Sequence, residues 1–305
     1  MPVTEPVVCA VDGGGTKTLA IVLDRNGIEL GRATAGPSNY VAGEAERVIV
    51  NVSAAVEAAL ESAGVFPALG SLWVGLAGID RSGAREAIAA RLAHLAATVR
   101  LTNDAQLLFG AFPDEVGIVL IAGTGSIALG QDRHGKTARA GGWGYLIGDE
   151  GSGYDLGRRG IRAAAKAADG RGLQTSLLPA FLTHWGLEDP LQIVDAVYRE
   201  RDRAVIAGCA GLVFDAADAW DPVASRLVQS GAAELASAVG AVEQALDFEN
   251  GAVPLVLAGS LLVERERYRA MVLDRIDHQF DLGEVHIVHE PALMAARHLA
   301  RSIPS

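Results

Sequence analysis

The feature that most constrains the fold is a glycine-rich turn near the start of the chain. Residues 12–17, which read DGGGTK, lie between two short apolar runs at 7–10 and 19–23 that are rich in β-branched residues, as strands are. Glycines allow positive φ angles and a close approach between backbone and ligand, and successive N–H groups in such a turn form a concave anion site. Thr16 and Lys17 would add a hydroxyl and a cation. The turn therefore predicts a phosphate site, although a glycine-rich hairpin without a ligand is the plainer alternative.

The bulk composition sets the class of protein and argues against several partners. A chain of 305 residues favours two domains, and 50% hydrophobic with 21% charged residues is typical of a soluble globular protein. A net charge of −11 without a basic block argues against nucleic acid or an anionic membrane as a partner. Cys9 and Cys209 lie far apart in apolar runs, which fits a reducing compartment and supports neither a zinc ribbon nor disulfides. Without a signal sequence or an apolar run of about 18 residues, we expect a cytoplasmic protein.

The order of predicted elements repeats along the chain. Residues 1–113 predict three strands and then alternating helices and strands, which indicates one α/β domain. The pattern of strand, glycine turn and strand restarts at residues 116–130, around the turn 123–126 that reads GTGS. Residues 152–246 are mostly helical in pattern, and a strand at 254–258, a helix to about 276, a strand at 284–288 and a helix at 291–301 follow. We therefore expect a second α/β domain over residues 114–305, with a helical insertion.

The second turn and two carboxylates complete the expected nucleotide chemistry. Two such hairpins, one per domain, would hold a polyphosphate in a cleft between the domains. Asp12 ends the strand before the first turn, where a carboxylate beside phosphate fits a Mg²⁺ ion between them. Asp104 lies at a strand-to-helix junction, where it would either cap the helix or act as general base for an attacking hydroxyl.

The stretch 141–153, which reads GGWGYLIGDEGSG, predicts a sugar site. Trp143 and Tyr145 offer flat apolar faces for the CH groups of a sugar, and the two carboxylates at 149–150 would accept from its hydroxyls. A structural loop is the alternative, but so many glycines cost backbone entropy with no evident gain in packing. Residues 130–137 match the phosphate-binding P-loop letter by letter, yet the residues that follow cannot form the helix which that motif must open. A charged hairpin tip is the better interpretation there.

These motifs, in this order along essentially the whole chain, resemble the N-acetylglucosamine kinase family, which is shared with bacterial glucosamine kinases and with BadF/BadG/BcrA/BcrD-type activator ATPases. The run GGWG followed by GDEGS is the most specific part. The resemblance implies an actin-like ATPase fold, a duplicated ribonuclease H-like α/β fold with a mixed sheet in each domain and ATP in the cleft. It also implies a dimeric kinase that uses ATP and Mg²⁺ to phosphorylate the 6-hydroxyl of an amino sugar. The alternative is an activator ATPase of the acyl-CoA dehydratase or reductase type.

The resemblance assigns roles to individual residues. It implies that Asp104 is the catalytic base and also binds the sugar, and that Asp12 positions Mg²⁺ through water. The residues that it implies for ATP binding are Gly13, Gly14, Gly15, Thr16, Lys17, Thr124, Gly125, Gly208, Ala258, Gly259 and Ser260. The residues that it implies for the sugar site are Asn39, Asp104, Ser126, Gly142, Trp143, Gly144, Tyr145, Leu146 and Asp149.

Without the resemblance, some of these residues have plainer interpretations, and the chain also departs from the family. Residues 258–260 alone predict an ordinary strand-to-helix turn, and Gly208 alone predicts close helix packing. The first turn has Lys17 where the animal enzyme has Arg, and two further positions carry Val41 in place of Trp and Ile127 in place of Asn. The last two departures leave the substituent on the sugar nitrogen open, so glucosamine, N-acetylglucosamine and a muramic-acid-type sugar all remain.

Overall fold

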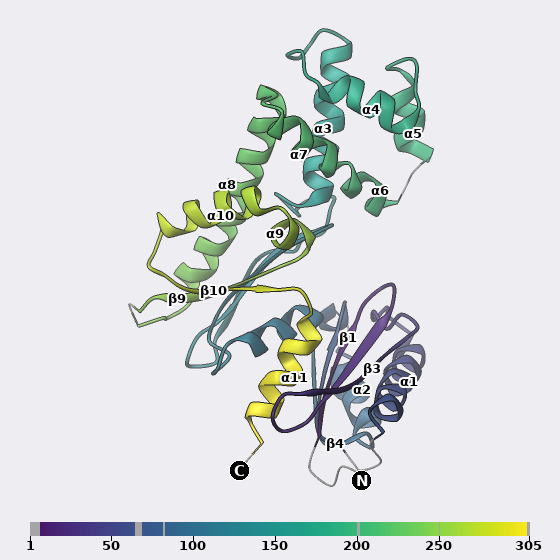
Figure 1. Ribbon diagram of the computed structural model, residues 1–305, viewed down its shortest axis with the longest axis vertical. Coiled ribbons are helices and arrows are strands. Elements are labelled where there is room, and N and C mark those ends of the chain that lie inside the picture. The colour runs from purple at the N-terminus through teal and green to yellow at the C-terminus, as the bar shows by residue number, and fades with distance from the viewer. Residues whose placement is uncertain (1–6, 65–68, 82, 200–201, 250, 304–305) are drawn as a thin grey trace. The chain divides into compact units, whose positions relative to one another are not determined.

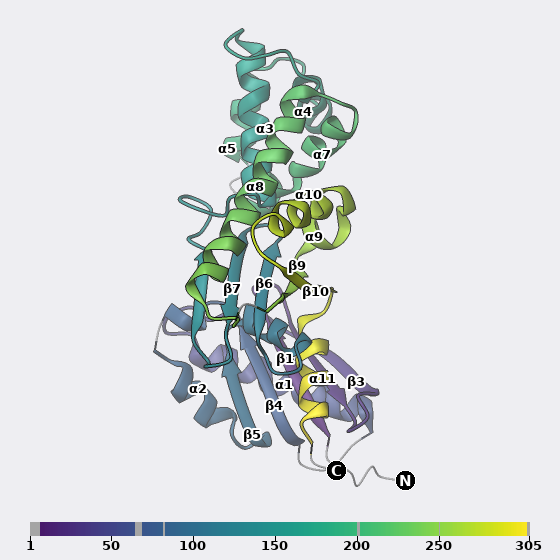
Figure 2. The same ribbon diagram turned by 90° about the vertical axis from the view of Figure 1, so that its left-hand side faces the viewer.

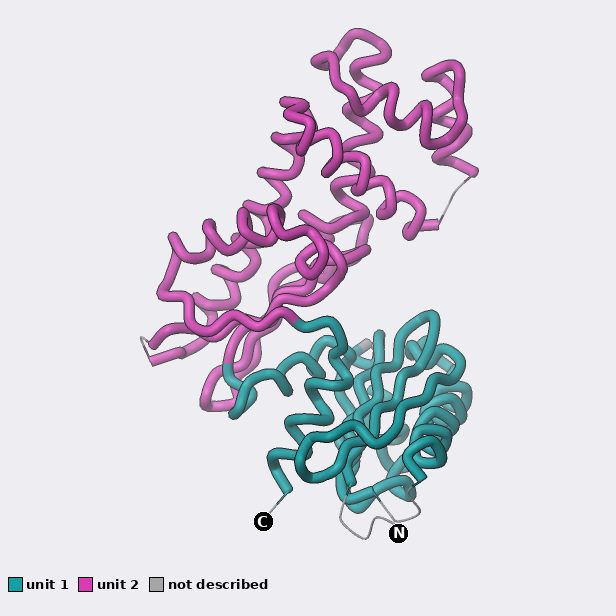
Figure 3. The backbone as a smooth tube through the Cα atoms, viewed as in Figure 1, with its two compact units in different colours: residues 1–116, 288–305 teal, residues 117–287 magenta. Residues whose placement is uncertain are grey.

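A computed structural model describes residues 7–64, 69–81, 83–199, 202–249 and 251–303, which fold into two compact units (Figures 1 and 3). The first unit comprises Met1–Val116 and Val288–Ser305, and the second comprises Gly117–Ile287. The division expected from the sequence, 1–113 and 114–305, places the boundary three residues earlier and does not include the return of the end of the chain to the first unit. The reason for this return is helix α11 (Pro291–Arg301), whose buried alanines pack in one apolar cluster with β1 residues of the first unit.

Each unit is built on one mixed five-stranded sheet, and the two sheets share a strand order. The first sheet runs β3-β2-β1-β4-β5 and the second β8-β7-β6-β9-β10. The first set comprises β1 (Val8–Gly13), β2 (Thr18–Leu23), β3 (Glu29–Ala35), β4 (Leu69–Leu76) and β5 (Ala96–Thr102). The second set comprises β6 (Gly117–Ala122), β7 (Ser126–Gln131), β8 (Thr137–Gly141), β9 (Val253–Ala258) and β10 (Leu282–Val288). Each sheet opens with an antiparallel three-stranded meander, and β4 and β9 then pair parallel to β1 and β6. The predicted duplication is confirmed.

The first sheet is covered on both faces by helices, and the apolar side chains of β1 point alternately to the two faces. Cys9 and Val11 belong to the apolar cluster that contains α1 (Ala45–Ala63), whereas Val8 and Ala10 belong to the cluster that contains α11. Figure 1 shows α1 and α11 on opposite sides of this sheet. The unit also contains the 3₁₀ helix η1 (Ile79–Arg81), helix α2 (Arg85–Leu92) and the 3₁₀ helix η2 (Asp104–Ala111).

The second unit adds a helical region to its sheet. Helix α8 (Pro222–Ala245) packs along β6, β7 and β8 (Figure 2), and Gly130 of β7 makes this approach possible because a Cβ there would lie 2.5 Å from Val242 Cγ1. The other helices of the unit are α3 (Gly153–Ala168), α4 (Leu177–Trp185), α5 (Gln192–Arg199), α6 (Arg203–Gly208), α7 (Ala210–Asp218), α9 (Ser260–Glu264) and α10 (Glu266–Asp277).

Two helical predictions differ from the structure in detail. The helix expected at residue 104 is a 3₁₀ helix, and the helix expected after Gly259 is interrupted at Arg265, whose φ and ψ are −100° and 82°. Within the stretch expected to be mostly helical, α6 and α7 are separate helices that meet at Cys209. Residues 130–137 form the predicted hairpin tip, in which the Asp132 carboxylate accepts from two backbone N–H groups of the turn. Among the described residues, no helix combines the length and the apolar character that a membrane crossing requires.

Candidate functional site

The first glycine turn connects β1 to β2 and is braced by the loop that follows β3. Gly14 N–H donates to Lys17 O at 3.1 Å, and the N–H groups of Ser38 and Asn39 donate to Gly14 O at 3.1 and 3.0 Å. Residues 15–17 form the exposed tip. Asn39, expected in the sugar site, lies beside this tip, because a Cβ on Gly15 would come 3.9 Å from its Cγ. The structure therefore brings a predicted sugar residue next to the predicted phosphate turn.

The floor of this turn has no space for a side chain. A Cβ on Gly13 would lie 2.3 Å from Ser38 Oγ and 2.5 Å from Leu76 Cδ2. The buried Thr18 hydroxyl lies 2.7 Å from the same Ser38 hydroxyl. The glycine at position 13 is thus required by packing, and the tip beyond it stays open.

Asp12 and Asp104 lie at the same edge of the first sheet, Asp12 near the end of β1 and Asp104 just after β5, with β4 between the two strands. Asp12 in β1 pairs with Gly75 in β4, and Gly75 pairs with Thr102 in β5, two residues before Asp104. A Cβ on Gly75 would lie 3.0 Å from Asp104 Cα, so this glycine lets η2 approach the sheet. Burial raises the pKa of Asp12 to about 6, the charge of Asp104 adds to the rise, and Lys17 opposes it. The two carboxylates therefore interact.

A neighbouring residue caps η2 and leaves the Asp104 carboxylate near Asp12. Asn103 is the N-cap: its side chain accepts from Gln106 N at 2.9 Å, and the Gln106 side chain accepts from Asn103 N at 3.3 Å. Asp104 is the first residue of η2, and its carboxylate accepts from Ala105 N at 3.0 Å. Burial is the main cause that raises the pKa of Asp104, with a smaller contribution from the charge of Asp80.

These carboxylates fit a Mg²⁺ ion that arrives with a nucleotide. Mg²⁺ is commonly held by one or two carboxylates together with substrate phosphates and water, and seldom by an all-protein cage. The pKa values of both carboxyl groups are raised because burial disfavours their charged form. A Mg²⁺ ion would supply the positive charge that stabilises this charged form. Within the described ranges, no group of three or more His, Cys, Asp or Glu side chains is arranged to hold a metal. The residues present therefore suit a metal that depends on phosphate ligands.

The second glycine turn connects β6 to β7 and is bonded to the start of α3. Gly123 N–H donates to Gly125 O at 2.9 Å. The N–H groups of Gly153 and Tyr154 donate to Gly123 O and Thr124 O at 2.8 and 3.3 Å. This turn is fixed by the helix that follows the predicted sugar loop.

The residues expected around adenosine gather beside the second turn. Gly259, at φ +86°, packs on β6, because a Cβ there would lie 2.4 Å from Ala122 O. Ser260 Oγ lies 3.7 Å from the position of a Cβ on Gly123. Ala258 pairs with Ile121 of β6. The backbone of Ala207, next to the exposed Gly208, lies on the other side, 3.1 Å from a Cβ placed on Gly153. The structure thus brings four segments of the second unit together.

The predicted sugar loop, residues 142–148, presents its apolar side chains to solvent. Trp143 is 67% and Leu146 77% exposed. The edge of the Tyr145 ring meets Tyr154 of α3, with centroids 5.0 Å apart, and the Arg139 guanidinium lies 5.2 Å from the Trp143 ring. Gly142 and Gly144 have φ angles of +66° and +88°, which explains why glycine stands at both.

The end of this loop turns inward to the second turn. Asp149 is 4% exposed, and its carboxylate accepts from Ser126 N at 3.3 Å. The Ser126 hydroxyl donates to Glu150 O at 2.8 Å. The N–H of Gly142 donates to Ser126 O at 3.1 Å. Ser126, Gly142 and Asp149, all expected in the sugar site, are therefore in direct contact.

Sequence reasoning missed the residues that hold these groups in place. Asp80 accepts from the side chains of Asn103 and Arg85, and so ties the cap of η2 to η1. Its sequence signal was a carboxylate two residues after Gly78, the glycine that follows β4. Tyr154 had no comparable signal, because its role depends on the fold of α3 against the loop.

A duplicated unit that opens with a strand, a glycine phosphate-type turn and a second strand defines the class of actin-like ATPases, and this chain has that fold. The chain belongs to the BadF/BadG/BcrA/BcrD ATPase family, whose pattern matches residues 10–296. It is 33% identical over 260 residues to the N-acetylmuramic acid/N-acetylglucosamine kinase of Clostridium acetobutylicum, covering 84% of this chain and 85% of that protein.

Two further proteins are similar over nearly the full length. The N-acetyl-D-glucosamine kinase of Dictyostelium discoideum is 27% identical over 310 residues, with 96% of this chain and 97% of that protein covered. The crystal structure of a Chromobacterium violaceum protein, proposed to be an N-acetylglucosamine kinase, gives a TM-score of 0.72 at 28% identity and covers 97% of this chain and 99% of that one.

Proposed function

We propose that this protein is an ATP-dependent amino sugar kinase that transfers the γ-phosphate of ATP to the 6-hydroxyl of N-acetylglucosamine or a related hexosamine. The named activities of the relatives support the amino sugar as substrate class. The observation that carries the chemistry is the pair Asp12 and Asp104 beside a glycine turn that bears Lys17. A carboxylate for the metal, a carboxylate for the hydroxyl and a cation for the phosphates are what phosphoryl transfer requires.

Asp104 acts on the attacking hydroxyl. Its carboxylate accepts the proton of the sugar hydroxyl, or orients that hydroxyl, while the oxygen attacks the γ-phosphate in line. Its raised pKa makes the carboxylate a stronger proton acceptor than an ordinary aspartate. Lys17 and the N–H groups of the turns stabilise charge on the phosphate oxygens. Asp12 would position a Mg²⁺ ion that arrives with ATP, and the ion would supply positive charge beside the phosphate oxygens.

The second unit supplies the remaining contacts. Gly259 and Ser260 would lie against adenosine, and Thr124 and Gly125 against phosphate. Trp143 and Tyr145 would stack on the sugar ring, since both rings are partly exposed. Asn39 and Asp149 would bind sugar hydroxyls. We further propose a homodimer that works in the cytoplasm, which sedimentation and fractionation would test.

The sugar itself is the open part of the proposal. Ile127 packs against Gly142, where a Cβ would lie 2.6 Å from Ile127 Cδ1. An apolar group therefore stands where the animal enzyme has Asn, beside the loop expected to hold the sugar. This position and Val41 are the ones at which glucosamine, N-acetylglucosamine and a muramic-acid-type sugar would be distinguished.

The activator ATPase alternative is not favoured. Such proteins hold an iron–sulfur cluster through cysteine thiolates. Cys9 is buried in β1 and Cys209 is buried between α6 and α7. Burial raises the pKa of Cys9 to about 12 and that of Cys209 to about 11, whereas metal-binding thiols are activated by a lowered pKa.

A coupled assay of ADP release tests the proposal. Mg-ATP would be offered with glucosamine, N-acetylglucosamine, N-acetylmannosamine, N-acetylmuramic acid, glucose or no sugar. The expected result is ADP release that depends on sugar, with one amino sugar preferred. ADP release that is the same with and without sugar would contradict the kinase, and iron in the purified protein would then support the alternative.

A further inference from the structure

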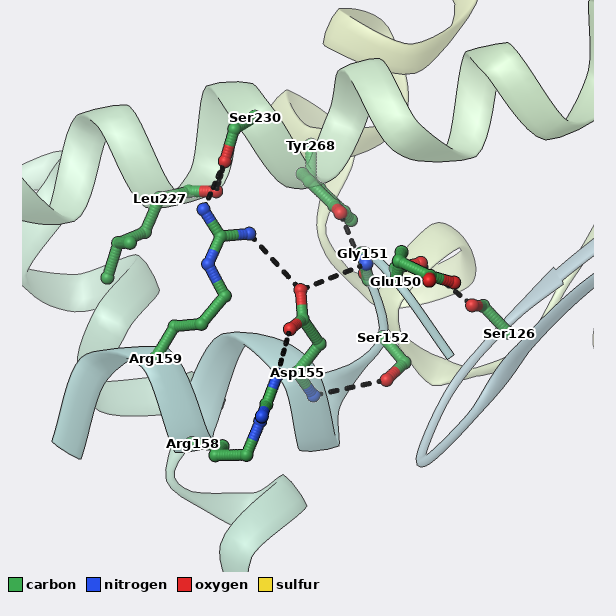
Figure 4. Close-up of polar contacts among 10 residues, drawn as sticks. All are labelled: Ser126, Glu150, Gly151, Ser152, Asp155, Arg158, Arg159, Leu227, Ser230 and Tyr268. Carbon is green, nitrogen blue, oxygen red and sulfur yellow. Dashed lines mark hydrogen bonds and ion pairs between the residues drawn. The ribbon is translucent and has the colours of Figure 1, made fainter. Parts of the chain in front are cut away.

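Buried side chains hold the peptide groups of Gly151 from two sides (Figure 4). The hydroxyl of Tyr268, on α10, donates to Gly151 O at 2.7 Å. Gly151 N–H donates to a carboxylate oxygen of Asp155, on α3, at 3.3 Å. Tyr268 is 1% and Asp155 6% exposed. The backbone at this point is thus tied to two helices by groups that are shielded from water.

The position leaves no room for a Cβ, and its carbonyl accepts from the Tyr268 hydroxyl. Gly151 has a φ of +73°, and a Cβ there would lie 2.5 Å from Gly231 O of α8. Its carbonyl is enclosed, so without the Tyr268 hydroxyl it would be a buried acceptor that lacks a bond, which is costly. Burial, with the nearby charge of Asp155, raises the pKa of Tyr268 well above its usual range, so the hydroxyl stays a neutral donor.

The Asp155 carboxylate is fixed by two arginines. Arg158 and Arg159 lie 3.2 and 3.1 Å from its oxygens. Arg159 also donates to the Ser230 hydroxyl on α8, so the ion pair links α3 to α8. Figure 4 shows this chain of contacts from Ser230 to Gly151. The carboxylate that receives Gly151 N–H therefore has little freedom to turn away.

Gly151, which Tyr268 and Asp155 hold as a clamp, lies two residues after Asp149. Asp149 has a φ of +59°, a conformation that side chains other than glycine adopt at a cost. Its carbonyl accepts from Ser152 N at 3.1 Å. Its carboxylate packs on the second turn, where Asp149 Oδ2 lies 2.8 Å from the position of a Cβ on Gly125. The segment 149–152 is bonded to the glycine turn on one side and to Tyr268 and Asp155 on the other.

We propose that Tyr268 and Asp155 are positioning residues for the phosphoryl-transfer reaction. They hold Gly151, and through it keep Asp149 in its strained conformation against the second glycine turn. Both residues are assigned an effect through Gly151, and neither is assigned a contact with substrate. This inference rests on the proposed function, and it extends the functional site to two side chains on α3 and α10 that the resemblance does not include.

The first test is Tyr268→Phe, which removes only the hydroxyl. We expect kcat/KM for the amino sugar to fall about tenfold, the scale of one buried hydrogen bond left unmade. The matched control is Thr175→Val, which removes a hydroxyl that donates to Asp221 Oδ2 at 2.9 Å elsewhere in the same unit. Both variants are expected to melt at a lower temperature, but only Tyr268→Phe loses kcat/KM. Unchanged kcat/KM in Tyr268→Phe would overturn the proposal.

A double-mutant cycle separates positioning from general stability. If Tyr268 acts through Asp149, Tyr268→Phe and Asp149→Asn together lower kcat/KM by much less than the product of their separate effects. A combined effect equal to that product would show that the two residues act independently, against the proposal. Asp155→Asn keeps an oxygen acceptor for Gly151 N–H, so it is expected to retain more activity than Asp155→Ala.

Hydrogen exchange tests the clamp without any substrate. Amides of residues 142–152 are expected to exchange faster in Tyr268→Phe than in the parent protein, and at the parent rate in Thr175→Val. Equal exchange in all three proteins would overturn the clamp. If the parent protein shows no sugar-dependent ADP release, the proposed function fails, and the exchange result still decides whether Tyr268 holds this loop.

Discussion

The two glycine turns occupy equivalent places in their sheets but have different surroundings. The first, between β1 and β2, has an exposed tip that carries Lys17, with Asp12 and Asp104 at its base. The second, between β6 and β7, is half-buried and bears no cation; it is held by Asp149 and by the first turn of α3. The same strand–turn–strand element thus provides charge in one unit and a fixed backbone in the other. Substitutions at the two turns should therefore reduce kinase activity for different reasons.

The largest effect is expected at Asp104. Asp104→Asn removes the proton acceptor and is expected to lower kcat by about 10²–10⁴-fold, the range for general acid–base groups. Asp149→Asn, beside the second turn, keeps the shape and is expected to cost about tenfold, the scale of one weakened hydrogen bond to a charged group. Steady-state kinetics on both variants measures this. Near-full turnover in Asp104→Asn, or a larger loss in Asp149→Asn, would reverse the roles assigned to the two turns.

The glycines of the two turns should respond unequally to a methyl group. In Gly125→Ala the new Cβ would lie 2.8 Å from Asp149 Oδ2, whereas in Gly15→Ala it would lie 3.9 Å from Asn39 Cγ. We expect kcat/KM for ATP to fall about 100-fold in Gly125→Ala, the loss typical of a misplaced charge-stabilising donor. Gly15→Ala should lose less than Gly125→Ala, because its Cβ meets no close atom of the protein. Equal losses would show that the packing around the second turn has no special importance.

The acid pair at the first turn predicts a pH-dependent gain in stability. Asp12 has a pKa of about 6, raised mainly by burial, against about 3.9 in an unfolded chain. A raised pKa means that the folded state prefers the protonated form, so stability is lost as pH rises between these values. The free energy of unfolding of Asp12→Asn should therefore be about 1–3 kcal/mol higher than that of the parent protein at pH 8 without nucleotide. The variant is nevertheless expected to be catalytically impaired.

Denaturant unfolding of Asp12→Asn at two pH values checks this. The gain should fall to about 0.2 kcal/mol near pH 3.5, where Asp12 is mostly protonated in both states. The control Glu57→Gln, on the exposed face of α1, should change stability little at either pH. A gain that is the same at pH 8 and pH 3.5 would mean that it does not come from the charge of Asp12.

The smallest effect is expected at the cation of the first turn. Lys17 is exposed and contributes one screened charge, so Lys17→Met should raise KM for ATP about three- to tenfold and spare the fold. Lys17→Arg keeps the charge and should bind ATP nearly as the parent does. If Lys17→Met costs more than Gly125→Ala, charge rather than backbone geometry dominates phosphate binding.

Local sequence signals account for most of what could be predicted. Both hairpins follow from glycine turns between apolar runs, and the hairpin tip at 130–137 follows from the absence of a helix after it. Residues 8–11 of β1 are all apolar, as expected of a strand whose two faces are both covered. In the structure these residues alternate between the two apolar clusters on the two faces of the sheet. Local patterns offered Asp104 as a helix cap or a general base and Asp149 as an acceptor for a sugar hydroxyl, and the resemblance was needed to choose these roles over the plainer interpretations.

The rest depends on contacts between distant segments. Tyr268 bonds to Gly151 across 117 residues, and nothing near either residue in the sequence indicates the pair. The return of α11 to the first unit depends on the close approach of Ala295 to Gly110. At the start of η2, Asn103 and Asp104 are adjacent and both residue types cap helices well, so the sequence alone does not choose between them. In the structure Asn103 is the cap, and its side chain also donates to Asp80.

The most direct test of the central account is the fate of the γ-phosphate. After incubation with Mg-ATP and the preferred amino sugar, ³¹P and ¹³C NMR of the mixture would identify the phosphorylated product. The account predicts a sugar monophosphate with phosphorus coupled to C6, formed in step with ADP. Inorganic phosphate as the sole product, with the sugar unchanged, would contradict it.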